Sequence, residues 1–278
     1  TQPPQKSQRG QKINKSPIHG ISETLKIESR TPNSLKDNKE EYNYLKKLNA
    51  DIAIVVAYGQ IIPKEYLGLV KKGFINIHAS LLPKWRGAAP IQRSIMNLEK
   101  ETGISIMKIG EKLDTGPICN SYKIEIKNDD NSETIAEKLS TLAAEKILDN
   151  IDEILEDKIE FKEQNHGNAT YADKIEKIEG QIKWSETAEN IIGKINGLYP
   201  SPGAFFIYNG ERYKILKASL AQGNGKIGEI LDNYLEISCG NKKSIKVLEI
   251  QRQGKRPQNI SEFMLGSQIK KGSNLNNV

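Results

Sequence analysis

The segment that decides the fold reads Gly73-Phe-Ile-Asn-Ile-His-Ala-Ser-Leu-Leu-Pro83 and runs on to Gln92. Residues 73–79 have the apolar content and the bounding glycine of a buried strand, and Pro90 is suited to the first turn of a helix predicted over 90–98. A strand, a loop and a helix in this order form the repeating unit of an α/β sheet, which binds ligands beyond the carboxyl ends of its strands. The segment therefore predicts a sheet and a site at its edge.

The flanking sequence continues the α/β pattern. The apolar run 51–58 ends at Gly59 and is typical of a parallel strand covered on both faces. Ser132 is a candidate N-cap for a long helix with a clear apolar period. Besides the elements already named, we predict a polar loop over 1–17, strands over 103–109 and 118–126, and this helix over 132–156. Strands that alternate with helices indicate an α/β domain built from right-handed crossovers.

After about residue 160 the pattern changes to short strands separated by Gly or Asn. Asn209-Gly210 lies between two apolar segments, 204–208 and 212–216, and this dipeptide favours a type I′ hairpin turn. Further strands are predicted over 226–231, 234–239 and 244–251, at a spacing typical of a small β-barrel. We therefore expect a first domain over 1–170, a linker over 171–183 and a second domain over 184–278.

Composition and charge exclude several classes of protein. The chain has 278 residues, 37% of them hydrophobic, which suits two folded domains. No apolar run approaches the roughly 18–20 residues of a membrane span, so no membrane partner is expected. The 2 Cys residues lack metal-ligand spacing and favour a reducing cytoplasm. The net charge of +6 originates in residues 180–278, where 14 Lys and Arg outnumber 8 Asp and Glu. This excess favours a polyanionic partner, and a lysine-rich solvated surface is the alternative.

Three polar residues form the candidate chemical site. Asn76 and His78 stand two apart in the predicted strand, so their side chains share a face near its end. An amide donor beside an imidazole can stabilise an oxyanion and transfer a proton, and Asp114, in a turn after a later strand, can orient that imidazole. A structural histidine and an ordinary Asp-Thr-Gly turn are the alternatives. Ser80 lacks the Gly-x-Ser-x-Gly setting of a hydrolase nucleophile.

The same residues carry a resemblance to a known family. Asn-Ile-His-x-Ser-Leu-Leu-Pro at 76–83 resembles the signature of enzymes that transfer a formyl group from 10-formyltetrahydrofolate. The continuation over 84–92, with Glu101-Thr-Gly103 and Leu113-Asp-Thr-Gly116, is similar to the methionyl-tRNA formyltransferase family. Shorter segments match in the same order, namely Thr1-Gln-Pro3, Arg9-Gly10, Ser16-Pro17, Ala57-Tyr-Gly59, Thr170-Tyr-Ala172 and Tyr199-Pro-Ser-Pro-Gly203.

The resemblance implies a fold, a reaction and a set of roles. The fold is a Rossmann-like formyltransferase domain with a mostly parallel sheet, followed by a small OB-like β-barrel that adds tRNA contacts. The reaction transfers a formyl group from 10-formyltetrahydrofolate to the amino group of initiator methionyl-tRNA, without a metal, in a bacterial-type cytoplasmic monomer. The implied residues are Asn76, His78 and Asp114 for catalysis, Ser80, Leu81, Leu82 and Pro83 for folate, and Arg9 and Lys12 for tRNA.

The sequence also departs from the family pattern. The chain starts at Thr1, inside a loop that the family precedes with a strand, a helix and a second strand, so about 30 residues are expected to be missing. Their loss is expected to expose the apolar run Ile52–Ala57 at an open sheet edge. Two alternatives remain: another 10-formyltetrahydrofolate-dependent formyltransferase, or a catalytically inactive, truncated RNA-binding relic.

Overall fold

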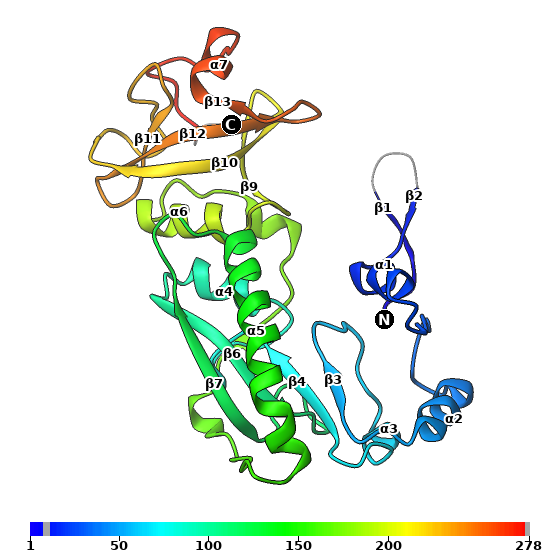
Figure 1. Ribbon diagram of the computed structural model, residues 1–278. Helices are drawn as coiled ribbons and strands as arrows, with labels where there is room; N and C mark the ends of the chain where they lie inside the picture. Colours follow the sequence, from blue (N-terminus) through cyan, green and yellow to red (C-terminus); the bar gives the residue numbers. More distant parts are fainter. Residues whose placement is uncertain (8–11, 276–278) are drawn as a thin grey trace. The chain divides into compact units, whose positions relative to one another are not determined.

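The structure is a computed structural model that describes residues 1–7 and 12–275. Figure 1 follows the chain through its helices and strands. The chain divides into two compact units, and the division passes through two strands and the longest helix. The first unit comprises Thr1–His78, Ile104–Ser121 and Ala143–Ala169, and the second comprises Ala79–Gly103, Tyr122–Leu142 and Thr170–Val278.

A four-stranded sheet carries the candidate site. Its strands are β3 (Ala53–Val55), β4 (Phe74–His78), β6 (Glu101–Lys108) and β7 (Ile118–Glu125), in the order β3-β4-β6-β7. β3 runs parallel to β4 and is followed by the short helix α3 (Lys64–Leu67), whereas β4 and β6 are antiparallel. The sheet is therefore mixed. A crossover connection would have made β6 parallel to β4, but the chain reverses its direction between them.

β3 buries one face only. Ala53 and Val55 pack against the cluster formed by Tyr66, Val70 and Phe74, whereas Ile54 between them is 38% exposed and Val56 is 55% exposed. The expectation that this run is covered on both faces is wrong, because its alternate side chains face away from the cluster.

The N-terminal segment of the first unit contains more regular structure than its polar sequence suggested. β1 (Gln5–Ser7) and β2 (Lys12–Asn14) pair antiparallel within the region expected to be a loop. Helix α1 (Pro17–Thr24) follows, with the Ser16 side chain accepting a hydrogen bond from the His19 N–H, and α2 (Lys39–Leu48) comes next. Backbone pairing between short strands leaves little apolar signal in a sequence, which explains the difference.

Two predicted helices are confirmed. α4 (Pro90–Met96) begins at its proline, and α5 (Ser132–Leu155) has 24 residues. Ser132 is the first helical residue rather than the cap: its hydroxyl donates to the Gly197 carbonyl at 2.5 Å. Asn131 caps the helix instead, because its side-chain oxygen accepts hydrogen bonds from the backbone N–H groups of Glu133 and Thr134 in the first turn.

The second unit contains a curled antiparallel sheet of short and long strands. Its strands are β9 (Ala204–Tyr208), β10 (Glu211–Ala221), β11 (Glu236–Ser238), β12 (Ser244–Arg252) and β13 (Gln258–Asn259), ordered β11-β12-β10-β9 with β13 on β12. The turn between β9 and β10 has φ of 49° at Asn209 and 75° at Gly210, as the type I′ prediction requires. Residues 226–231, expected to be a strand, make only isolated bridges around a turn at Gly228. In the described residues the sheet is an open half-barrel.

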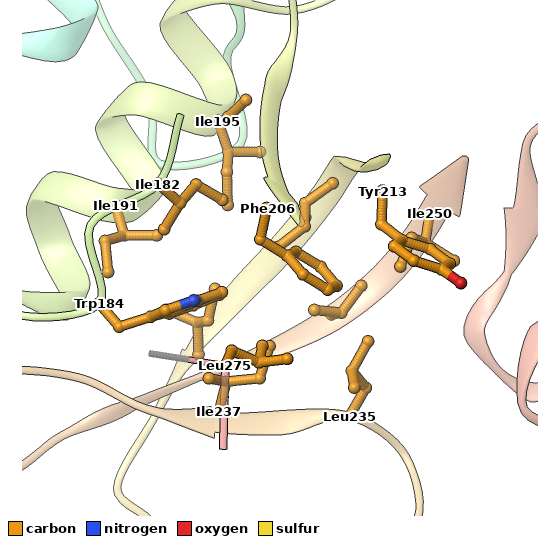
Figure 2. Packing of buried hydrophobic residues seen from close by; sticks show 14 of the residues in the cluster. Ile182, Trp184, Ile191, Ile195, Phe206, Tyr213, Leu235, Ile237, Ile250 and Leu275 are labelled. Carbon is orange, nitrogen blue, oxygen red and sulfur yellow. The ribbon is translucent and has the colours of Figure 1, made fainter. Parts of the chain in front are cut away.

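One hydrophobic core holds the second unit together. Figure 2 shows Phe206 and Tyr213 side by side, with Trp184 across the cluster. The rings of Phe206 and Tyr213 stack with centroids 5.4 Å apart, and Trp184 meets Phe206 edge-on.

The remaining elements of the chain are α6 (Ala188–Gly197), α7 (Ile260–Leu265), β5 (Arg86–Gly87), β8 (Tyr171–Ala172) and the 3-10 turns His166–Asn168 and Lys177–Gly180. Across the described part of the chain, no helix combines the length and apolarity needed to cross a membrane.

Candidate active site

β4 carries two of the three candidate catalytic side chains. His78 is the last residue of this strand, and Asn76 lies two residues earlier and therefore on the same face. His78 pairs across the sheet with Ser105, which is fully buried, and Asn76 pairs with Met107. The flanking apolar residues Ile75 and Ile77 are buried, so the strand that carries the polar pair is fixed by its neighbours.

Asp114 lies in the turn that follows β6. Its φ of 50° is in the left-handed region, which a short polar side chain tolerates better than most. Gly116 closes the turn against β6, since a Cβ at this position would lie 2.0 Å from the Lys108 carbonyl oxygen. Only glycine permits that approach. The turn is thus held in one position beside the strand.

The structure brings His78 and Asp114 together. The imidazole Nδ1 lies 3.7 Å from a carboxylate oxygen of Asp114, and the side chains are only 7% and 11% exposed. This separation is longer than a hydrogen bond but allows electrostatic attraction to a protonated imidazole. Histidine–carboxylate contacts of this kind often tighten when substrate binds. The site can therefore stabilise a transient imidazolium next to an amide donor on the same strand.

Gln164 contributes to this site, and sequence reasoning did not identify it. Its side-chain nitrogen donates to the carbonyl oxygens of Asp114 at 2.9 Å and Gly116 at 2.7 Å, and the residue is buried. Because both acceptors flank the turn, these bonds fix the backbone that carries the carboxylate. Gln164 stands in a polar segment, and nothing in its neighbours distinguishes a buried amide from a solvated one.

The four residues expected to bind folate follow β4 directly and belong to the second unit. The Ser80 hydroxyl is fully buried and donates to the Lys84 carbonyl at 2.6 Å, which stabilises the turn. Leu82 is also buried, while Leu81 and Pro83 are partly exposed. The turn therefore offers apolar surface and backbone groups, and its serine hydroxyl already holds the turn together.

Comparison with known proteins identifies the family. Residues 1–151 match the model described as formyl transferase, and residues 174–268 match the model for the formyl transferase C-terminal domain. The chain belongs to the formyl transferase family. Membership confirms the predicted fold class, an N-terminal formyltransferase domain with a β-rich domain after it.

Individual formyl transferases extend the comparison. The methionyl-tRNA formyltransferase of Pelagibacter ubique (strain HTCC1062) is 73% identical over 278 residues, which cover 100% of this chain and 90% of that protein. Among solved structures, a sugar 3N-formyl transferase, WlaRD, studied with dTDP and 5-N-formyl-THF, has a TM-score of 0.67 at 22% identity and covers 86% of this chain and 82% of its own. HypX from Aquifex aeolicus, in complex with tetrahydrofolic acid, has a TM-score of 0.63 at 17% identity, with 83% and 41% coverage. These two structures support the formyl transferase fold.

The structure describes one of the two residues expected to contact tRNA. Arg9 lies outside the described residues. Lys12 is the first residue of β2, next to the segment that is not described. For a metal, no group of three or more His, Cys, Asp and Glu side chains within residues 1–7 and 12–275 is arranged as a ligand set.

Proposed function

We propose that this formyl transferase moves a formyl group from 10-formyltetrahydrofolate to the α-amino group of initiator methionyl-tRNA, and so acts in translation initiation. The observation that carries the proposal is the buried pair of His78 and Asp114, 3.7 Å apart, with Asn76 on the same strand. The 73% identity to a protein named methionyl-tRNA formyltransferase supports the choice of acceptor. Two structural neighbours studied with folate compounds support a folate-derived donor.

The three side chains have separate tasks in the mechanism. The donor substrate supplies an activated formyl carbon, which the free methionyl amine attacks, and the new C–N bond leaves a tetrahedral oxyanion. The Asn76 amide and the His78 imidazole donate hydrogen bonds to that oxygen. Asp114 keeps His78 oriented and stabilises its positive charge while the amine proton passes to the departing folate nitrogen. The C–N bond to folate then breaks, and no covalent intermediate with the protein is formed.

Other parts of the chain are assigned to substrate binding. We assign Ser80, Leu81, Leu82 and Pro83 to the folate side through their backbone and apolar surface. Arg9 and Lys12 are assigned to the tRNA acceptor end, because both are cations in one short basic segment. The proposed domain limits remain 1–170 and 184–278, with a linker over 171–183. The protein is proposed to act as a monomer in the cytoplasm, where aminoacylated tRNA is used.

Two alternatives predict different products. A formyl transferase for another amine would use the same donor and the same trio but would leave methionyl-tRNA unmodified. A relic that only binds RNA would retain tRNA affinity without turnover. The decisive assay incubates the full chain with 10-formyltetrahydrofolate and methionyl-tRNA and measures formyl-methionine after deacylation. Initiator and elongator methionyl-tRNA are compared in parallel.

The matched variants are His78→Ala and His166→Ala. Both remove an imidazole, but His166 is exposed in a 3-10 turn and has no assigned role. We expect His78→Ala to lose at least about a hundredfold in kcat, the usual contribution of general acid–base catalysis, with unchanged tRNA affinity. His166→Ala should retain wild-type turnover. Near-normal activity in His78→Ala would contradict the assignment, and wild-type protein that binds tRNA but forms no product would favour the relic.

A further inference from the structure

The strand β10 of the half-barrel has two faces with different roles. Tyr213 points into the core seen in Figure 2, and Ile215 belongs to the same cluster. Because successive side chains alternate, Arg212 and Lys214 lie on the outer face. Phe205 of β9 is directly opposite Lys214 and shares that face. The outer side of this hairpin therefore combines two cations with an aromatic ring.

Within residues 1–7 and 12–275, Arg212 stacks on an aromatic ring and has no carboxylate partner. Its guanidinium carbon lies 3.6 Å from the centroid of the Phe205 ring. Its Nε is buried and has no hydrogen-bond acceptor among the described residues. Burial lowers the pKa of Arg212. Stacking occupies one flat face of the guanidinium, and an acceptor would have to approach the terminal N–H groups in the guanidinium plane.

Lys214 is also only partly hydrated. Its side chain crosses Gly203, where a Cβ would lie 2.9 Å from the lysine Cδ and 3.3 Å from its Nζ. Glycine at this position, with φ of +82°, gives the side chain room to lie there. Burial and the nearby charge of Arg212 lower the pKa of Lys214. No ion pair to Lys214 is found in the described part of the chain, so the two cations repel each other without a counter-charge.

Two other arginines of the second unit, one at the end of β12 and one in the turn between β12 and β13, each have a carboxylate partner. Arg252 lies 2.6 Å from Glu211, and Arg256 lies 2.7 Å from Glu262. Glu211 also accepts a hydrogen bond from Tyr213, which directs its carboxylate away from the outer face. Partly buried cations without a counter-ion are costly, and a bound anion would remove both the desolvation and the repulsion.

We propose that Arg212 and Lys214 form a phosphate-binding pair on the outer face of the β9–β10 hairpin, and that this pair holds a backbone phosphate of the tRNA substrate. The proposal rests on the proposed function, which supplies a polyanion as substrate. A forked guanidinium and a point-charge ammonium are the usual ligands of phosphate oxygens. The positive excess of residues 180–278 favours the same partner. Neither residue takes part in the formyl transfer itself.

The test uses the full chain and three neutral variants. Arg212→Gln and Lys214→Met each remove one charge of the pair, and Arg256→Gln removes the same charge from an arginine that already has a carboxylate partner. The KM for methionyl-tRNA is measured between about 0.05 and 0.2 M salt, since a lost phosphate contact lowers the slope of log KM against log salt by about one. At about 0.15 M salt we expect each pair variant to raise this KM about fivefold. The kcat and the KM for the formyl donor should not change.

Control measurements separate binding from folding. Thermal melting should not fall in the pair variants, because an unpaired charge has been removed. Arg212→Lys and Lys214→Arg, which keep the charge, should keep the wild-type salt slope. An unchanged KM and slope in the neutral pair variants would overturn the proposal, and so would an equal effect of Arg256→Gln. If the wild type fails to formylate methionyl-tRNA, the proposed function fails, and tRNA binding measured by fluorescence anisotropy still decides the phosphate site.

Discussion

Replacement of Asp114 by Asn removes one charge from the site and keeps the size of the side chain. The carboxylate lies 3.7 Å from Nδ1 of His78, and both side chains are largely buried. At about 4 Å and an effective dielectric constant of about 20, two unit charges attract by about 4 kcal/mol. In the proposed mechanism His78 gains its positive charge during proton transfer, so this energy acts on the transition state. Asp114→Asn should therefore lower kcat by about a thousandfold.

The assay is steady-state formylation of methionyl-tRNA with the donor in excess, which gives kcat and the KM for tRNA. Asp157→Asn is the matched control, because that carboxylate is 80% exposed and pairs with Lys72. The KM for tRNA and the thermal melting of Asp114→Asn should match those of the wild type. A kcat within tenfold of the wild-type value would refute the reasoning, since the charge of Asp114 would then contribute little to the transition state. An equal loss of kcat in Asp157→Asn would point to a general effect of the net charge of the protein.

Three further predictions concern single interactions. Gln164→Leu should lower the free energy of unfolding by about 2 kcal/mol in urea titrations, because two carbonyl oxygens lose their donor, and it should reduce kcat more than substrate affinity. Burial opposes ionisation of Asp130, but the ammonium of Lys138 and neighbouring hydrogen-bond donors outweigh it and lower the pKa of Asp130. The ionised carboxylate therefore stabilises the folded protein at neutral pH, and this contribution is lost as the pH falls below about 3.9. Lys138→Met should therefore lower the melting temperature at pH 7, and the difference from wild type should disappear in acid. Burial raises the pKa of Cys239 to about 12, so in a Cys119→Ser background the remaining thiol should react with Ellman's reagent at pH 8 only after unfolding.

The local elements of the fold were predictable because their signals are local. The apolar period of α5, the proline at the start of α4 and the Asn209-Gly210 turn each depend on a few neighbouring residues. The direction of β4 against β6 was not predictable in this way, because strand pairing depends on how the intervening chain returns. The same holds for residues 226–231, whose apolar pattern is satisfied by burial of Ile230 without a strand.

The candidate site shows the same limit. Asn76 and His78 were placed together by the two-residue period of a strand, which sequence alone supplies. The partnership of Asp114 with His78 was a hypothesis from its turn after a later strand, which the motif resemblance strengthened, and the structure adds the distance and the burial. Gln164 and the cation pair of β10 were missed, because a buried polar side chain is recognised only from what surrounds it.

The two hydrogen bonds from Gln164 also bear on how the chain can be cut. The turn at Asp114 receives its support from a residue about 50 positions later, beyond the end of α5. A fragment that stops with the first family match, at residue 151, contains all three side chains proposed for catalysis but lacks this support. The backbone of Arg86 likewise pairs with that of Tyr171 in the β5–β8 ladder. A fragment of the first domain should therefore end after residue 172. During synthesis, the turn at Asp114 receives its support only once residue 164 has left the ribosome.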